Sequence, residues 1–160
     1  MFEKGDKIVY PMYGAGVIEG LEEKQIDGEK MQYYVLNIPV GNLKIMISVI
    51  NADTLGIREV SKSEEIFEII KSIKGRPINM SENWSQRYRD NLEKIKTGDL
   101  SEVAEVFRNL LEREKKRALS SAEKKMLTNA KQIILSEIIL SRDVSKTEAE
   151  ILLSETIEAC

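Results

Sequence analysis

The 160-residue chain contains no histidine and a single cysteine, Cys160. Without histidine the chain lacks the commonest general base, the usual transition-metal ligand, and the Ser-His and Cys-His nucleophile pairs. One cysteine forms neither an intrachain disulfide nor a thiolate metal cluster, so we interpret Cys160 as a terminal residue without a structural role. These absences disfavour most hydrolase chemistry, and we expect no catalytic residues, no metal and no cofactor.

Long hydrophobic runs are also missing. No stretch approaches the ~20 apolar residues of a membrane span, and residues 1–6 lack the basic and then apolar regions of a signal peptide. We therefore expect a cytoplasmic protein without membrane contact. Gly14 and Gly16 begin a dinucleotide fingerprint, but its third glycine is absent and a strand-like stretch follows, so we interpret the pair as a turn at a strand edge. The acidic residues lie mostly on solvated helix faces, which indicates a protein that is not an enzyme.

The charge is slightly negative overall, at −3, and unevenly distributed. Residues 1–60 carry six basic and nine acidic side chains, residues 84–131 carry twelve and eight, and residues 132–160 carry two and six. An acidic net charge argues against a free-standing, tight DNA-binding protein. Any contact with a polyanion is expected in the basic middle segment.

Residues 1–60 have the pattern of a small β domain. Strands are expected at residues 6–10, 16–21, 31–38, 43–49 and 55–57. Asp27-Gly28 is a hairpin signal, Pro11 ends the first strand, and Gly41-Asn42 supplies a residue at positive φ before the fourth. The third strand is apolar on both sides, which predicts an interior position. Five short strands at this spacing favour an SH3-like or Tudor-like barrel.

The hydrophobic period becomes helical after residue 60, and capping boxes recur. The boxes pair Ser61 with Glu64, Asp99 with Glu102, Ser120 with Glu123, and Ser145 with Glu148. A first helix is expected between Ser61 and Gly75, and others at residues 84–96, 100–119, 122–140 and 146–159. We therefore predict an α+β protein, with the barrel in residues 1–60 and a compact domain of about five helices in residues 61–160.

Trp84 is the only tryptophan, and it stands at an expected helix start marked by Asn83 and Gln86. Helical spacing places Trp84, Arg87 and Tyr88 on one side of the first two turns. An apolar wedge beside cations suits nucleic acid better than catalysis. The alternative is an ordinary buried stripe formed by Trp84, Tyr88, Leu92 and Ile95.

Two further segments are candidate contact surfaces. The basic run 113–117 ends one expected helix and Lys124-Lys125 begin the next, so both converge on one loop. Cations at a helix C-terminus complement its dipole, which is the structural alternative for the first run, whereas Lys124 and Lys125 oppose the dipole at an N-terminus. In the barrel, residues 44–48 form a possible edge strand for docking. Its alternative is a core strand whose Ile45 and Ile47 fill the barrel while the intervening residues face outward.

These segments together resemble the CarD/CdnL family of bacterial RNA polymerase-binding transcription regulators over nearly the whole chain. The segments that carry the resemblance are residues 5–11 (GDKIVYP), 14–16 (GAG), 83–88 (NWSQRY), 91–94 (NLEK), 98–99 (GD), 103–106 (VAEV), 119–120 (LS) and 123–127 (EKKML). A barrel of this kind also occurs in transcription-repair coupling factors, whose helicase motor is absent here.

The resemblance implies a Tudor-like barrel that binds the β subunit of RNA polymerase, partly by edge-strand pairing. It also implies a helical domain that contacts DNA at the upstream edge of the transcription bubble, with Trp84 as the wedge. On this basis we assign to DNA contact Trp84, Arg87, Tyr88, Arg89, Arg113, Lys124 and Lys125. We assign to polymerase binding Lys24, Ile26, Lys44, Met46 and Ser48.

The function expected from this reading is a non-enzymatic regulator that docks on RNA polymerase and stabilises the open promoter complex. Contacts with the DNA backbone are expected to be independent of base sequence, and the protein to be a monomer that reaches the nucleoid through polymerase. The alternative is a cytosolic protein–protein adaptor with a docking barrel and a structural, buried Trp84. Which promoters respond, and whether the effect is activation or repression, depends on promoter kinetics.

Overall fold

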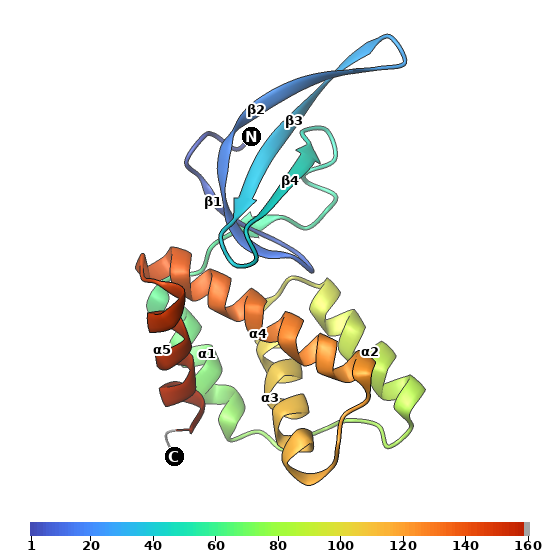
Figure 1. The fold of residues 1–160 in the computed structure, drawn as a ribbon, viewed down its shortest axis with the longest axis vertical. Helices are drawn as coiled ribbons and strands as arrows, with labels where there is room; N and C mark the ends of the chain where they lie inside the picture. The colour runs from blue at the N-terminus through green and yellow to red at the C-terminus, as the bar shows by residue number, and fades with distance from the viewer. Residues whose placement is uncertain (159–160) are drawn as a thin grey trace.

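The computed structural model describes residues 1–158, and Cys160 lies outside the described residues. It has a sheet at one end and helices at the other (Figure 1). The strands are β1 Lys7–Tyr10, β2 Gly14–Ile26, β3 Glu29–Ile38, β4 Leu43–Ser48 and β5 Arg58–Glu59. They form one antiparallel sheet in the order β4-β3-β2-β1-β5. The expected five strands and the interior position of the third are therefore confirmed.

All five strands differ from the predicted bounds, mostly by one or two residues, and two of the differences are larger. β2 runs on to Ile26, because Asp27 and Gly28 both have positive φ and close a two-residue turn in which Ile26 pairs with Glu29. The fifth strand predicted at residues 55–57 is misplaced: β5 is Arg58–Glu59, because Gly56 has a φ of +74° in the preceding turn. The long hairpin of β2 and β3 therefore extends away from the rest of the sheet (Figure 1).

The sheet curls around its own small core. The register of β2 against β3 shifts between Ile18 and Gly20, and such a bulge bends a strand and increases its twist. The buried side chains of this core are Ile8, Ile18, Tyr34, Leu36, Ile38, Ile47 and Ala52. Tyr34 also accepts a 3.0 Å hydrogen bond from the backbone N–H of Phe2, which satisfies its buried hydroxyl. The predicted Tudor-like arrangement is confirmed.

Five helices follow, as predicted. They are α1 Ser63–Lys74, α2 Trp84–Lys96, α3 Leu100–Lys116, α4 Ser121–Arg142 and α5 Lys146–Glu158. Asn83, Asp99 and Ser120 cap α2, α3 and α4 with side-chain oxygens that accept backbone N–H groups of the first turn. α3 ends three residues earlier than expected, because Arg117 has extended φ and ψ.

The predicted cap at Ser61 is wrong. α1 begins at Ser63 after Lys62, which makes no side-chain cap. The backbone N–H of Ser61 instead donates to Glu137 Oε2 at 2.8 Å, and its carbonyl accepts from Ser141 Oγ at 2.8 Å. Both partners belong to α4, so the backbone N–H and carbonyl of Ser61 are hydrogen-bonded to another helix, and Ser61 does not cap α1.

The sheet is packed against α4 at the turn between β1 and β2. Ala15 is buried, and its N–H donates to Ser136 Oγ at 2.8 Å. Gly14 has a φ of +115°, and a Cβ there would lie 2.7 Å from Ser136 Oγ, so any other residue would be strained and would displace Ser136. The predicted turn at residues 14–16 is wrong, because these residues begin β2 and pair with β1, while the turn itself is formed by residues 11–13. The start of β2 forms part of the contact between sheet and helices.

An ion pair strengthens the same contact. Arg58 donates two hydrogen bonds of 2.8 Å to the fully buried Glu137 carboxylate of α4. Arg58 Nε also donates to the carbonyl of Gly98, between α2 and α3, at 2.9 Å. The guanidinium thereby joins β5, α4 and the α2–α3 connection. Among the described residues no helix has the length and apolarity that a membrane span requires.

Candidate functional site

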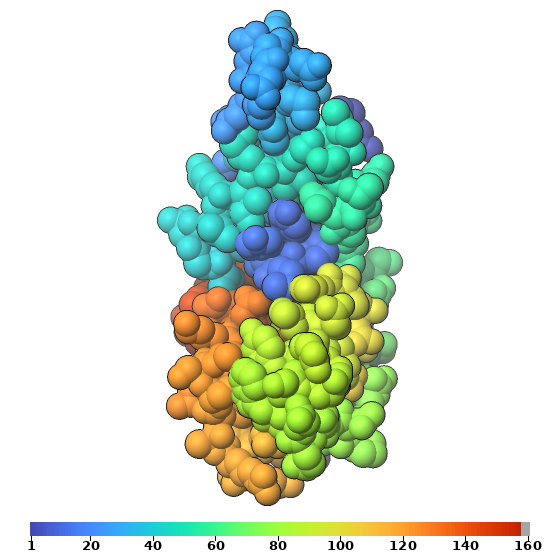
Figure 2. Space-filling model, turned by 90° about the vertical axis from the view of Figure 1, so that its right-hand side faces the viewer, coloured from blue at the N-terminus to red at the C-terminus, as the bar shows by residue number. Residues whose placement is uncertain are grey.

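Trp84 is the first residue of α2 and is 45% exposed. The helix starts there because Asn83 Oδ1 accepts the N–H of Gln86 at 3.0 Å. Its other end is followed by Gly98, which packs against Pro11 of the sheet, so the Trp84 end points away from the sheet. In Figure 2 the β2–β3 hairpin and α2 lie in opposite halves of the molecule, with the β1–β2 turn between them.

The alternative of a buried Trp84 is therefore contradicted. The buried residues of α2 are Arg87, Asn91 and Ile95, of which Arg87 and Asn91 each lie one position before a member of the expected apolar stripe. Tyr88 and Leu92 are half-buried. Ile95 is the only member of the expected stripe that is fully buried.

The indole of Trp84 is held by two neighbours. Its Nε1–H donates to Ser120 Oγ at 3.0 Å, across the gap between α2 and the cap of α4. Its ring stacks on Tyr88, with centroids 5.6 Å apart and 15° between the planes. Tyr88 thus lies against one face of the indole, and the only polar atom of the indole is hydrogen-bonded. The exposed part of the indole is therefore apolar.

Arg87 requires a correction to the expected DNA contacts. Its side chain is buried, and its Nε and Nη2 donate to the carboxylate of Glu123 at 2.8 and 3.2 Å. Its Nη1 donates to the carbonyls of Ser81 and Glu82, each at 3.2 Å. All three guanidinium nitrogens donate hydrogen bonds within the protein, so Arg87 supports the start of α2 and does not face a ligand.

The electrostatics of this pair are mutual. The hydrogen bond from Arg87, more than opposing burial, lowers the pKa of Glu123 below its ordinary value. The hydrogen bond to Glu123 likewise raises the pKa of Arg87. Both groups therefore remain charged although they are removed from water.

Ser120 connects this buried pair to Trp84. Its hydroxyl accepts the indole N–H, accepts the backbone N–H of Glu123 at 3.1 Å, and donates to Glu123 Oε1 at 3.2 Å. Trp84, Ser120, Glu123 and Arg87 thus form one chain of hydrogen bonds between α2 and α4. The capping box of Ser120 and Glu123 was visible in the sequence, but nothing there placed it beside Trp84.

The cations that were expected to contact DNA differ in their polar partners. Arg89 is exposed and donates to Gln86 Oε1 at 3.0 Å, while Gln86 in turn donates to Asp90. Lys124 and Lys125 are exposed near the start of α4, four and five residues after Ser120, and no ion pair involves them among the described residues.

Arg113 lies in a shallow pocket of about 270 Å³ with Glu82, two residues before Trp84. Lys116 and Arg117 line the same pocket, and both are exposed. Lys115 by contrast pairs with Glu112 at 3.1 Å. Arg113, Lys116 and Arg117 thus share a pocket with Glu82, whereas Lys115 is paired on its own helix.

The candidate docking residues share one face of the sheet. The register aligns Lys24 with Met31, Met46 with Val35 and Ser48 with Tyr33, and residues paired across strands point to the same side. Ile26 and Lys44 belong to this side by alternation. We call the residues Lys24, Ile26, Met31, Tyr33, Val35, Lys44, Met46 and Ser48 the docking face.

The predicted edge is also present. β4 ends the sheet, so its outer backbone has no strand partner within the described residues. The core-strand alternative holds for the other face of β4, where Ile47 is buried. Lys44 pairs with Glu19 at 3.4 Å, and both are substantially exposed, so this ion pair contributes little to stability. Within the described residues no group of His, Cys, Asp or Glu side chains is arranged to hold a metal ion.

Comparison with known proteins adds three findings. The family model described as "CarD, C-terminal domain" matches residues 68–154, and the model "CarD-like/TRCF RID domain" matches residues 2–61. A Bacillus subtilis (strain 168) protein named "Putative transcription factor YdeB" is 39% identical over 148 residues, which cover 92% of this chain and 97% of that protein. The solved structure "CdnLNt from Myxoccoccus xanthus" is 37% identical and covers 38% of this chain and 84% of its own, with a TM-score of 0.33.

Proposed function

The chain belongs to the CarD family of transcription regulators, and from that premise we propose that it docks on the β subunit of RNA polymerase and stabilises the open promoter complex through Trp84. Residues 1–60 act as the polymerase-interacting domain and residues 61–160 as the DNA-contacting domain. The protein works as a monomer, without catalysis, and reaches the nucleoid through polymerase.

The docking face supports the first half of this proposal. It presents Met31, Met46 and Tyr33 beside Lys24 and Lys44, and it borders the open edge of β4. A strand of the polymerase that pairs with β4 gains main-chain hydrogen bonds, and alternate side chains on the face supply selectivity. Methionine adapts its shape to a partner, which suits such a contact.

The exposed part of Trp84 supports the second half. A tryptophan side chain has ~200 Å² of surface, so an exposed fraction of 45% leaves about 90 Å² to bury, worth about 2 kcal/mol at ~25 cal/mol/Å². Inserting a side chain at a base step costs a few kcal/mol of unstacking, but stacking is already broken at the edge of a bubble. Trp84 therefore favours the open over the closed complex.

A differential of this size is sufficient. A ligand shifts the equilibrium between two states by the difference in its binding free energy for them. A difference of about 1.4 kcal/mol in favour of the open complex raises the ratio of open to closed complex tenfold. Arg89, Arg113, Lys124 and Lys125 add contacts with the DNA backbone that carry no sequence information. Arg87 contributes indirectly, because it holds the segment from which Trp84 projects.

The contact between sheet and helices transmits the docking geometry to Trp84. Arg58, Glu137, Ser136 and Gly14 join β5, α4 and the β1–β2 turn, so the position of α2 follows from the position of the sheet. Docking raises the effective concentration of the helices at DNA to roughly millimolar, which removes the need for tight binding by the free protein. Free protein is accordingly expected to bind duplex DNA weakly at physiological salt.

The half-exposed Trp84, already oriented by Ser120, is the observation that carries this proposal. The test is the lifetime of a promoter open complex of bacterial RNA polymerase after competitor challenge. The wild type is compared with Trp84→Ala and with Ile151→Ala, which truncates an apolar residue of similar exposure on α5. Lengthening by the wild type and Ile151→Ala only, with all three bound to polymerase, supports the wedge. An unchanged lifetime with the wild type bound to polymerase refutes it.

A further inference from the structure

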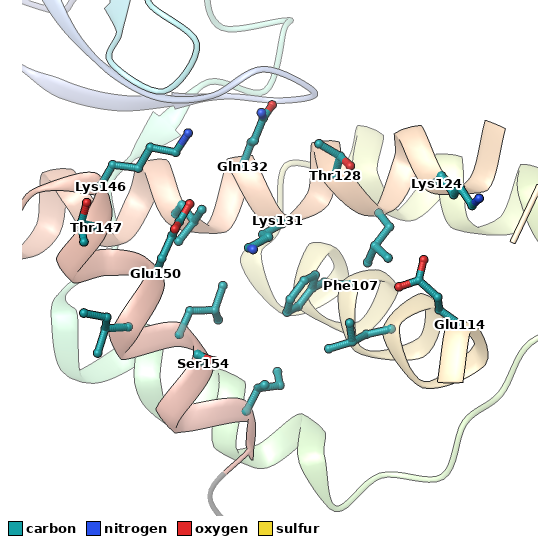
Figure 3. Close-up of a pocket in the computed structure, with 16 residues that line it drawn as sticks. Phe107, Glu114, Lys124, Thr128, Lys131, Gln132, Lys146, Thr147, Glu150 and Ser154 are labelled. Carbon is teal, nitrogen blue, oxygen red and sulfur yellow. The ribbon is translucent and has the colours of Figure 1, made fainter. Parts of the chain in front are cut away.

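A groove between α3, α4 and α5 has no role in the proposed function except for Lys124 at its margin, which was assigned to DNA contact. It has a volume of about 830 Å³, within the range of ligand-binding clefts. Figure 3 shows side chains of all three helices facing it, with Phe107 at its centre. Its apolar lining consists of Phe107, Leu111, Leu127, Leu135, Ile151, Leu153 and Ile157.

The lining is apolar beyond what the core of the protein needs. Ile151 is 52% exposed, and Leu111, Leu127 and Ile157 are only half-buried. These side chains form a strip that joins the walls of α3, α4 and α5. Clustered exposure of this kind marks an interaction surface, whereas scattered single residues do not.

The charges around the strip are unevenly distributed. Lys124 and Lys131 belong to α4, and Figure 3 shows Lys131 beside Phe107, with its amine in the space between α3 and α5. Lys146, at the start of α5, brings the amines to three. The three lysines are exposed, and none has an ion-pair partner in the part of the chain that the structure describes.

The carboxylates of the groove belong to the other two helices. Glu114 projects from α3, and Glu150 projects from α5, which also carries Lys146. An acidic edge of an occupant is therefore favoured on α4, which contributes two lysines and no carboxylate to the groove, whereas on α3 or α5 it meets Glu114 or Glu150.

The dimensions suit a short helix. The lining runs along α4 from Lys124 to Leu135 and along α5 from Lys146 to Ile157. At 1.5 Å per residue each wall is roughly 16 Å long, which is about three helical turns. A helix lays apolar side chains at positions i, i+3, i+4 and i+7 into such a groove.

We propose that the groove between α3, α4 and α5 binds an acidic amphipathic helix of a partner protein. Its apolar face covers the strip from Leu127 to Ile151, and its acidic edge lies against Lys124 and Lys131. A nucleic-acid backbone also attracts lysines, but its sugars and phosphates gain little from a floor of leucine, isoleucine and phenylalanine. This proposal does not depend on the action of Trp84.

The test uses a fluorescein-labelled, end-blocked model peptide of about 14 residues, with leucines at i, i+3, i+4 and i+7 and glutamates along one flank. Binding is followed by fluorescence anisotropy. One control peptide has the same composition in an order without helical period, and a second has lysine in place of glutamate. The protein variants are Lys131→Glu and, as a matched charge reversal on the exposed side of α1, Lys71→Glu.

The acidic helical peptide is expected to bind, and both control peptides are expected not to. Lys131→Glu should weaken binding by about tenfold or more, and Lys71→Glu by about twofold or less. The proposal is overturned if no peptide binds, if the peptide without helical period binds equally, or if both variants weaken binding alike. It is also overturned if sedimentation shows a wild-type dimer that Lys131→Glu dissociates, since the occupant is then a second copy of the chain.

Discussion

Trp84 Nε1 donates a 3.0 Å hydrogen bond to Ser120 Oγ, although 36 residues separate them in the chain. Ser120 is at the same time the cap of α4. The stability of the α4 start and the orientation of the exposed indole therefore depend on one hydroxyl. A side chain that is already oriented loses less conformational freedom on binding, which increases the affinity it contributes.

Replacing Ser120 should reveal both roles. Ser120→Ala should lower the free energy of unfolding by about 1 kcal/mol through the lost cap, and it should also shorten the open-complex lifetime. Ser120→Thr should restore both, because threonine keeps the hydroxyl. The matched control is Ser145→Ala, which removes the equivalent cap oxygen at Glu148 but no contact with Trp84. Equal lifetimes for the two alanine variants would contradict the role of Ser120 in orientation.

Breaking the buried ion pair should be costly. Arg87→Met leaves the Glu123 carboxylate buried without its partner and should reduce the free energy of unfolding by about 3–5 kcal/mol. Lys94→Met is the control, since the pair of Lys94 with Glu105 is partly exposed and should be worth about 1 kcal/mol or less. Chemical denaturation measures both. Similar losses would show that Arg87 is not the structural residue described here.

The same pair should make stability depend on pH. Since the folded pKa of Glu123 lies below its unfolded value of about 4.3, the carboxylate contributes fully above that value and loses its contribution as pH falls through the folded pKa. The difference in unfolding free energy between wild type and Glu123→Gln should thus be largest near neutral pH and shrink below about pH 4. A difference that grows on acidification would contradict the assigned direction.

The contact between sheet and α4 should be sensitive at Gly14. Gly14→Ala incurs both the positive φ and the 2.7 Å approach to Ser136 Oγ, whereas Gly28→Ala incurs a positive φ with no neighbour within 4 Å. The Gly28 variant should lose about 1 kcal/mol, and the Gly14 variant a further 1–3 kcal/mol or so. Thermal and chemical unfolding compare them. Equal losses of unfolding free energy in the two variants would show that Ser136 moves aside at Gly14 without a measurable cost.

The docking face should determine polymerase affinity. Met46→Glu places a charge on that face and should weaken binding to the β subunit by about tenfold. Leu21→Glu is the control, because Leu21 pairs with Tyr34 and so belongs to the opposite face, where it is 50% exposed. Surface plasmon resonance with immobilised polymerase measures both. Weaker binding by Leu21→Glu alone would assign docking to the other face.

Much of the fold was predictable because its signals are local. The hairpin at Asp27-Gly28, the caps at Asn83, Asp99 and Ser120, and the change from strand to helix after residue 60 depend on residues a few positions apart. Ser61 failed as a cap for the opposite reason. Its backbone groups are bound by Glu137 and Ser141, about 80 residues away.

The features of the candidate site were likewise predictable where they depend on local sequence, and not where they depend on tertiary contacts. Residue types and helical spacing alone determined that Trp84 begins a helix beside cations and that the docking residues alternate along strands. Only the tertiary structure decided that Arg87 is buried with Glu123, that Ser120 holds the indole, and that three helices leave a groove beside Lys131. Periodicity fixes which residues share a face of one element, but burial and pairing depend on which element packs against that face, and that choice is made by contacts distant in sequence.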